Sequence, residues 1–130
     1  MTDVKPPKRV AIYARYSTEM QSPKSVEDQI RDCTEEAQRN GWIVVESYAD
    51  HAMSGARSDR PEFQRLESDL SSRRFDTVLV EHLDRLSRDQ ELTARFYKRA
   101  MFHDVGLYQL GRGEVSAMEI ALTGPWQQPS

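Results

Sequence analysis

An arginine and a serine stand two residues apart near the amino terminus, in the segment Tyr13-Ala14-Arg15-Tyr16-Ser17. The apolar run just before it predicts a strand buried on both faces, so Ser17 follows the carboxyl end of that strand, where open α/β sheets usually bind their ligands. A guanidinium beside a hydroxyl places a fixed cation next to a potential nucleophile. Serine after a strand is also common as a turn or cap residue, and the segment alone leaves both interpretations open.

A second charged segment, Leu83-Asp84-Arg85-Leu86-Ser87-Arg88-Asp89, follows the apolar run at 75–80. Arg85 and Arg88 are three residues apart, and Asp84 and Arg88 are four apart, so on a helical turn all three would share a face. Two guanidinium forks on one face suit the oxygens of a phosphodiester, and Asp84 would orient an arginine or relay a proton. Taken alone, the segment also fits an amphipathic helix start with solvated charges.

The elements that position these residues alternate along the chain. Apolar runs predict strands at 8–14, 42–48, 75–80 and 106–110. Ser25 and Asp28 resemble a capping box, which predicts a helix from Ser25 to a left-handed stop at Asn40-Gly41, with Gln29 facing the loop before it. Its apolar stripe contains the residues Val26, Ile30, Cys33 and Ala37.

Two further helices are predicted. One opens at Asp59-Arg60-Pro61 with Asp59 as its cap, after a polar loop at 49–59, and this puts Arg60 at a helix entrance. The other contains Leu92, Phe96 and Ala100. Residues 111–114 are expected to form a turn, and 115–122 fit either a strand or a short helix. The alternation predicts an α/β, three-layer domain with a mostly parallel central sheet of four or five strands, in which the ends of the first and third strands open onto one edge.

Composition narrows the classes of function. The chain has 130 residues, a hydrophobic content of 38% and a net charge of -3, which together suit one domain that does not hold nucleic acid by bulk electrostatics. No apolar stretch approaches the length of a membrane span, and 1–8 lacks the apolar segment of a signal peptide, so we expect a cytoplasmic protein with no membrane partner. The single cysteine, Cys33, is expected to pack in the core.

The three motifs in their order resemble the catalytic domain of the serine recombinases, the family of resolvases, invertases and large integrases. Arg-x-Ser follows the first strand, Asp-Arg-Pro opens the second helix, and Leu-Asp-Arg-Leu-x-Arg-Asp follows the third strand. The loop around Asp50 and Ser54 and the turn at 111–116 look closer to the large serine recombinases than to small resolvases. A flavodoxin-like or receiver-type domain would instead need a glycine-rich loop or an acidic cluster after the first strand.

The resemblance implies a mechanism. Ser17 would attack a DNA phosphodiester, form a 5′-phosphoserine link and release a 3′-hydroxyl, and religation would follow strand exchange in a synaptic tetramer built from dimers. The residues that would bind the scissile phosphate are Arg15, Arg60, Arg85 and Arg88. The residues that match supporting positions are Tyr13, Gln29, Asp50 and Ser54. Asp84 is the candidate for proton transfer, and the base that deprotonates Ser17 stays open.

No cofactor and no metal is expected in this mechanism. The three histidines show no metal-ligand spacing, and no set of carboxylates resembles a two-metal nuclease. An array of fixed cations can instead stabilise the charge that develops on the phosphoryl oxygens. The expected partners are DNA and further copies of the chain.

The expected organisation is a disordered leader at 1–8, the catalytic domain at 9–124 and a tail at 125–130. Pro125 and Pro129 argue against a continuing helix, so we expect the chain to stop before the dimerisation helix and the DNA-binding domains of the family. An alternative function follows from this expectation: a non-catalytic remnant that keeps the fold and acts in assembly or regulation.

Overall fold

The computed structural model describes residues 7–16, 25–51, 60–86 and 90–116. Strands and helices alternate along them, as the sequence predicts. The elements in chain order are β1 (Arg9–Arg15), α1 (Val26–Arg39), β2 (Ile43–Asp50), α2 (Pro61–Asp69), the 3-10 turn η1 (Leu70–Ser72), β3 (Thr77–Val80), the 3-10 turn η2 (Leu83–Arg85), α3 (Gln90–Phe102), β4 (Gly106–Gln109) and β5 (Gly113–Glu114).

A five-stranded sheet in the order β2-β1-β3-β4-β5 forms the centre of the domain. β1 pairs in parallel with β2 and with β3, β3 pairs in parallel with β4, and β5 alone is antiparallel. The mostly parallel sheet predicted from the alternation is therefore confirmed. Because β1 and β3 are parallel neighbours, their carboxyl ends lie at the same edge of the sheet.

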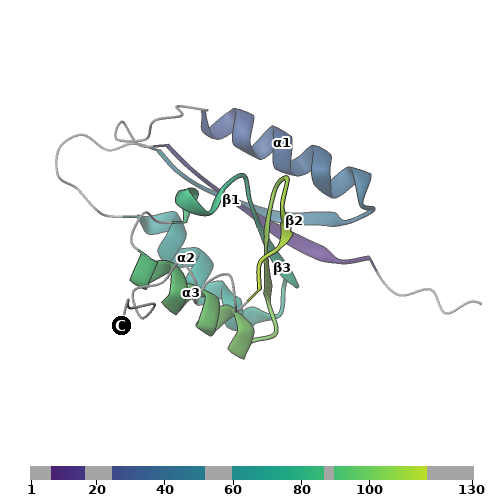
Figure 1. The fold of residues 1–130 in the computed structure, drawn as a ribbon. Helices are drawn as coiled ribbons and strands as arrows, with labels where there is room; N and C mark the ends of the chain where they lie inside the picture. The colour runs from purple at the N-terminus through teal and green to yellow at the C-terminus, as the bar shows by residue number, and fades with distance from the viewer. Residues whose placement is uncertain (1–6, 17–24, 52–59, 87–89, 117–130) are drawn as a thin grey trace, which may run out of the picture.

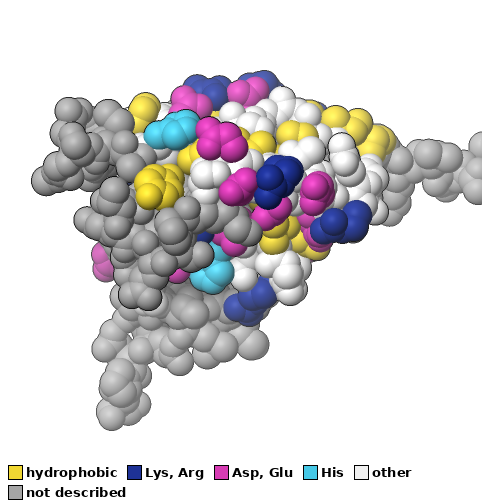
Figure 2. Space-filling model, turned by 90° about the horizontal axis from the view of Figure 1, so that it is seen from above, with side chains coloured by type: hydrophobic (Ala, Val, Ile, Leu, Met, Phe, Trp, Pro, Cys, Tyr) yellow, Lys and Arg dark blue, Asp and Glu magenta, His cyan; other side chains and the backbone are white. Residues whose placement is uncertain are grey.

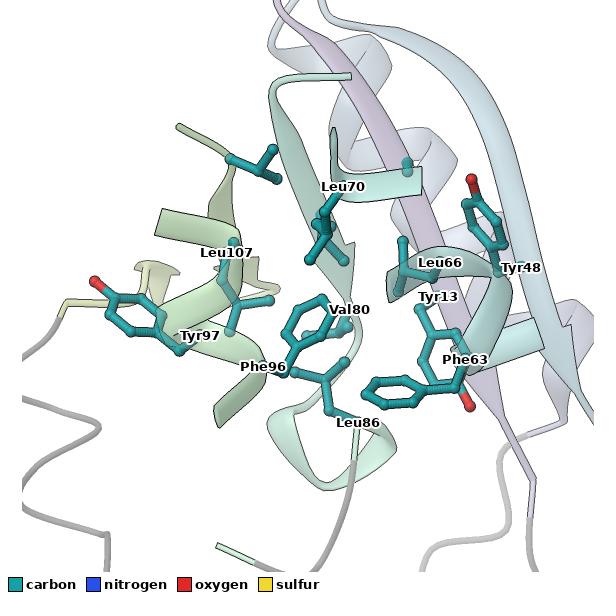
Figure 3. Packing of buried hydrophobic residues seen from close by; sticks show 14 of the residues in the cluster. Tyr13, Tyr48, Phe63, Leu66, Leu70, Val80, Leu86, Phe96, Tyr97 and Leu107 are labelled. Atoms are coloured by element: carbon teal, nitrogen blue, oxygen red, sulfur yellow. The ribbon is translucent and has the colours of Figure 1, made fainter. Parts of the chain in front are cut away.

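Helices cover both faces of this sheet (Figure 1). α1 packs on one face over a small cluster that includes Ile12, Cys33 and Leu79. α2 and α3 cover the other face over the larger cluster, in which Phe63, Phe96 and their neighbours pack against β1, β3 and β4 (Figure 3). The three-layer architecture and the buried position of Cys33 are thus as predicted.

The outer surface on the α1 side carries charges of both signs. Figure 2 shows acidic and basic side chains interleaved there, and ion pairs such as Arg31–Asp28 and Arg39–Glu36 lie along α1. This face of the described chain has no continuous basic patch, in keeping with the net charge of -3.

The ends of α1 follow the predicted signals. The Asp28 amide donates to Ser25 Oγ at 3.1 Å, which satisfies a helix N–H group that has no partner within the helix. At the other end Asn40 is the C-cap and Gly41 has a φ of +73°, a conformation that glycine adopts without steric cost. Between them Val26, Gln29, Cys33 and Ala37 are buried, so the polar Gln29 faces the interior.

Two local predictions were wrong. The second strand continues through Ala49 to Asp50, whereas the sequence predicted a loop from Ala49, because both residues continue the parallel pairing with Ala14 and Arg15. The expected turn at 111–114 is shorter: Gly113 and Glu114 form β5 and pair with Gln109 and Tyr108. Val115, within the stretch that fits a strand or a helix, is buried and its amide donates to the Leu107 carbonyl at 2.8 Å.

The entrance of α2 is also built differently. The sequence predicted Asp59 as the cap, but Arg60 occupies the N-cap position and makes no capping hydrogen bond with its side chain, and Asp59 lies outside the described residues. The carboxylate of Asp50 does the capping, since it accepts from the amides of Glu62 at 3.1 Å and Phe63 at 3.0 Å. The end of β2 therefore fixes the start of α2.

Candidate active site

Arg15, the last residue of β1, is held in place by a buried glutamine. The Gln29 side chain donates to the Arg15 carbonyl at 3.0 Å and accepts from the Arg15 amide at 3.2 Å, and Gln29 is fully buried. These two bonds continue the ladder of β1 with a side-chain amide from α1. The next amide, of Tyr16, donates to the Asp50 carbonyl at 3.1 Å. The chain that leads to Ser17 is thus fixed on both sides.

The side chain of Arg15 reaches from β1 to η2. Its Nε donates to the Arg85 carbonyl at 3.1 Å and its Nη2 donates to the Asp84 carbonyl at 3.3 Å. Burial lowers the pKa of Arg15, and the nearby cations Arg60 and Arg85 lower it further. Arginine stays charged despite such a shift, so three positive charges converge at the carboxyl edge of β1 and β3.

Arg60 belongs to a connected set of hydrogen bonds at the entrance of α2. Its Nη2 donates to the Tyr13 hydroxyl at 3.2 Å, and that hydroxyl donates to Asp50 Oδ2 at 2.7 Å. Burial raises the pKa of Tyr13, so the phenol keeps its proton at neutral pH and stays a donor to the carboxylate. Asp50 thereby holds both the helix end that carries Arg60 and the tyrosine that Arg60 contacts.

The guanidinium of Arg60 lies on aromatic rings and against η2. Its Cζ is 4.3 Å from the ring centroid of Phe63 and 5.7 Å from that of Tyr13, within the range of cation–π attraction. Its Nη2 also donates to the Leu86 carbonyl. Its Nε is buried and makes no hydrogen bond within the described part of the chain.

The 3-10 turn η2, called the arginine turn below, separates the side chains of Asp84 and Arg85, which the sequence predicted on one face. The Arg85 side chain is 5% exposed and its Nε donates to Glu81 Oε1 at 3.0 Å, whereas the Asp84 side chain is 64% exposed and its carboxylate lies 3.6 Å from His82 Nδ1. Consecutive residues of a 3-10 turn point about 120° apart, because the turn has about three residues. The predicted shared face of Asp84 and Arg85 was therefore wrong in this turn.

Some of the candidate residues are not placed. Ser17, Ser54 and Arg88 lie outside the described residues. The other candidate residues come together at the carboxyl edge of β1, β2 and β3. They are Tyr13, Arg15, Gln29, Asp50, Arg60, Asp84 and Arg85.

Three residues that hold η2 were missed by the sequence reasoning. Gln109, at the end of β4, is buried and its Oε1 accepts from the Leu83 amide at 3.0 Å. His82 Nδ1 accepts from the Asp84 amide at 3.1 Å, and Glu81 binds Arg85 as described above. A signal was available: each is a polar residue at or just beyond the end of a predicted apolar strand.

Within the described ranges, no group of three or more histidine, cysteine or carboxylate side chains is arranged to hold a metal ion. The same ranges contain no helix that is both long and apolar enough to cross a membrane.

A parallel α/β sheet with arginines gathered at its carboxyl edge defines the class of domain, and comparison gives the family. The chain belongs to the family described as Resolvase, N terminal domain, which matches residues 10–119. The predicted relation to the serine recombinases, the large ones included, is confirmed by solved structures. The crystal structure of the N-terminal catalytic domain of TP901-1 integrase is 37% identical, covers 88% of each chain and has a TM-score of 0.74.

Two further relatives are also named as recombinases. A resolvase family site-specific recombinase from Streptococcus pneumoniae is 25% identical, with a TM-score of 0.76 over 88% of this chain and 82% of that one. A protein of Bacillus subtilis (strain 168) named "Putative DNA recombinase" is 41% identical over 81 residues, which are 61% of this chain and 16% of that protein. The chain thus spans a small part of the length of this curated relative.

Proposed function

We propose that this chain is the catalytic domain of a site-specific DNA recombinase that cuts and rejoins DNA through Ser17. The observation that carries the proposal is the convergence of Arg15, Arg60 and Arg85 at the edge where β1 leads into the serine segment. Three fixed positive charges at the end of the strand that precedes a potential nucleophile in the sequence suit a reaction at a phosphodiester, because its transition state gathers negative charge on the phosphoryl oxygens.

In the proposed reaction the Ser17 hydroxyl gives up its proton, and its oxygen attacks the scissile phosphorus and forms a 5′-phosphoserine bond. The bond to the 3′ oxygen breaks, and that oxygen leaves as a hydroxyl after it takes up a proton. Because a phosphodiester is exchanged for another phosphodiester, little free energy is lost and the reverse attack by a 3′-hydroxyl can rejoin the DNA. Asp84, whose carboxylate is exposed beside His82, is the proposed residue for proton transfer.

The arginines make hydrogen bonds that a phosphate can replace. Arg15 and Arg60 donate to backbone carbonyl oxygens of residues 84–86, which are neutral acceptors. A phosphate oxygen carries negative charge and accepts bidentate guanidinium pairs, so it is a stronger partner for these arginines than a neutral carbonyl oxygen. Arg88, together with the supporting Ser54, completes the proposed set by resemblance to the family.

The proposal also covers the substrate, the oligomeric state and the cellular location of the protein. DNA is the proposed substrate, and the protein is proposed to act as a homo-oligomer that passes from dimers to a synaptic tetramer in the cytoplasm. The net charge of -3 supports a domain that contributes chemistry at the phosphate more than bulk affinity for DNA.

A covalent adduct tests the proposal. The protein is incubated with a library of duplexes that carry random sequences and scattered nicks, so that a cleaved strand diffuses away before it can be rejoined. We expect a protein–DNA adduct on a denaturing gel, with the DNA attached at Ser17 in peptide mass spectra. Ser17→Ala should abolish it, and Ser47→Ala, a change at an exposed serine of β2, should leave it intact.

The same assay separates the two candidate functions. An adduct that persists in Ser17→Ala, or that maps to another residue, would refute the nucleophile. Absence of any adduct, together with duplex binding that Arg15→Gln and Arg60→Gln leave unchanged, would favour the non-catalytic role in assembly or regulation.

A further inference from the structure

We propose that Glu81 is a positioning residue for Arg85, which it aims and partly neutralises at the phosphate-binding edge. The inference rests on the proposed function, in which Arg85 contacts the scissile phosphate. Glu81 follows β3 directly and is not one of the residues that the three motifs single out.

The geometry supports a positioning role. Arg85 Nε donates to Glu81 Oε1 at 3.0 Å, and the exposed fractions of the two side chains are 5% and 22%. A guanidinium is planar and its five N–H groups keep a fixed arrangement, so a bond at Nε fixes the plane of the whole fork. Because both side chains are largely shielded from water, this pair is less screened than an ion pair on the surface.

The backbone under this pair is fixed as well. Gln109 Oε1 accepts from the Leu83 amide and His82 Nδ1 accepts from the Asp84 amide. The backbone amides of the first two residues of η2 are therefore both held by side chains. Glu81 sits at the end of β3, within the sheet edge that also carries Arg15. The remaining freedom of Arg85 is therefore that of its side chain, and Glu81 restricts it.

The negative charge of Glu81 has an effect on phosphate binding opposite to that of its hydrogen bond: the bond aims Arg85, whereas the charge weakens the attraction for a phosphate. Arg15, Arg60 and Arg85 are like charges at one edge and repel one another, and this repulsion adds to the effect of burial in lowering the pKa of Arg15. A carboxylate beside Arg85 offsets part of that repulsion but also weakens the attraction of the edge for a phosphate. Glu81→Gln keeps an oxygen that can accept from Arg85 Nε and removes the charge, so it separates the two effects.

The first test follows the Arg85 Nε–H group by nuclear magnetic resonance in the wild-type chain and its variants. In Glu81→Ala its hydrogen exchange should accelerate about tenfold, as expected for the loss of one charge-assisted hydrogen bond. In Glu81→Gln exchange should stay close to the wild-type rate. Equal exchange in the wild type and in Glu81→Ala would overturn the proposal.

The second test measures binding of a short fluorescent duplex at low salt. Glu81→Gln should bind about threefold more tightly than Glu46→Gln, a control with the same change in net charge, because local charges act more strongly than distant ones. Glu46 pairs with Arg65 and Arg74, which lie outside the proposed site. The excess should vanish when Arg85→Gln is added. Equal binding of Glu81→Gln and Glu46→Gln, or an excess that survives without Arg85, would overturn the proposal.

The two tests keep this inference apart from the proposed function. Duplex binding that is unchanged in Arg15→Gln, Arg60→Gln and Arg85→Gln alike would refute a phosphate site at this edge. The exchange of Arg85 Nε–H needs no DNA and would still decide whether Glu81 positions the guanidinium.

Discussion

The two edges of the sheet use similar groups in different surroundings. At the carboxyl edge Asp50 and Arg85 are 6% and 4% exposed; Asp50 joins β2 to Tyr13 on β1 and to the start of α2, and Arg85 pairs with Glu81 just after β3. At the amino edge Arg9 and Asp76 also join β1 to the start of β3, but their side chains are 43% and 44% exposed. The ion pair at the amino edge is therefore well hydrated, whereas the buried Asp50 and Arg85 at the carboxyl edge are largely shielded from water.

This difference in burial determines how strongly a polar contact fixes the side chains that make it. A buried polar group that loses its partner bears the full cost of its desolvation, while an exposed one turns to water. We therefore expect the buried hydrogen bonds at the carboxyl edge to restrict the arginines that they hold more strongly than the exposed ion pair restricts Arg9. Mutations at the two edges should differ accordingly, and we order them from the largest expected effect to the smallest.

The largest effect is expected for Asp50→Ala. The change removes the acceptor of the Tyr13 hydroxyl and of the Glu62 and Phe63 amides, all of which are at least partly buried. We expect the free energy of unfolding to fall by about 3 kcal/mol, since a lost cap and a buried donor without a partner each cost about 1 to 2 kcal/mol. Urea unfolding followed by circular dichroism measures it.

A matched control exists at Asp69, whose Oδ2 accepts from the Tyr48 hydroxyl at 2.6 Å but caps no helix through that bond. Asp69→Ala should cost about 1 kcal/mol, the usual value of one hydrogen bond. Equal losses in the two variants would mean that Asp50 does not organise the entrance of α2.

Asp50 also shows where reasoning from the sequence stops. Local signals were sufficient for α1, because Ser25 and Gly41 act on their own helix. The cap of α2 comes from the preceding strand, and a spacing rule that looks one to three residues ahead of a helix selects Asp59 instead. The contact depends on the parallel pairing that extends β2 to Asp50, which is a tertiary effect.

The arginine turn shows a second limit. The spacing of Asp84, Arg85 and Arg88 predicts a shared face only if the segment is α-helical, and η2 is a 3-10 turn. Its amides donate to Gln109 on β4 and to His82, the N-cap residue of the turn. The motif was sufficient to predict the edge of the sheet at which these residues lie, but not that the Arg85 side chain is buried and the Asp84 carboxylate is exposed.

An intermediate effect is expected for Gln29→Met, which keeps the volume of the side chain and removes both hydrogen bonds to the Arg15 backbone. We expect a loss of about 2 kcal/mol in the free energy of unfolding, because a backbone amide and a carbonyl lose their partners at a partly buried site. Amide exchange at Arg15 should accelerate more than at Ile12. Gln38→Met, at an exposed position of α1, is the control, and equal exchange at Arg15 in both variants would contradict the role of Gln29.

The smallest effect is expected for Asp76→Asn at the amino edge, and it should depend on pH. The hydrogen bonds from the Arg9 side chain and amide hold the pKa of Asp76 below its ordinary value. A carboxylate whose pKa is lowered by folding adds stability above the unfolded pKa of about 4 and loses it as the pH falls through the folded value. The difference in melting temperature between wild type and Asp76→Asn should therefore be present at pH 7, shrink in high salt and disappear in acid. Because both side chains are well exposed, the loss in free energy of unfolding in Asp76→Asn should also be smaller than the loss in Gln29→Met at every pH. A difference that is constant with pH, or one as large as that of Asp50→Ala, would show that the amino edge is as tightly organised as the carboxyl edge and would remove the contrast between them.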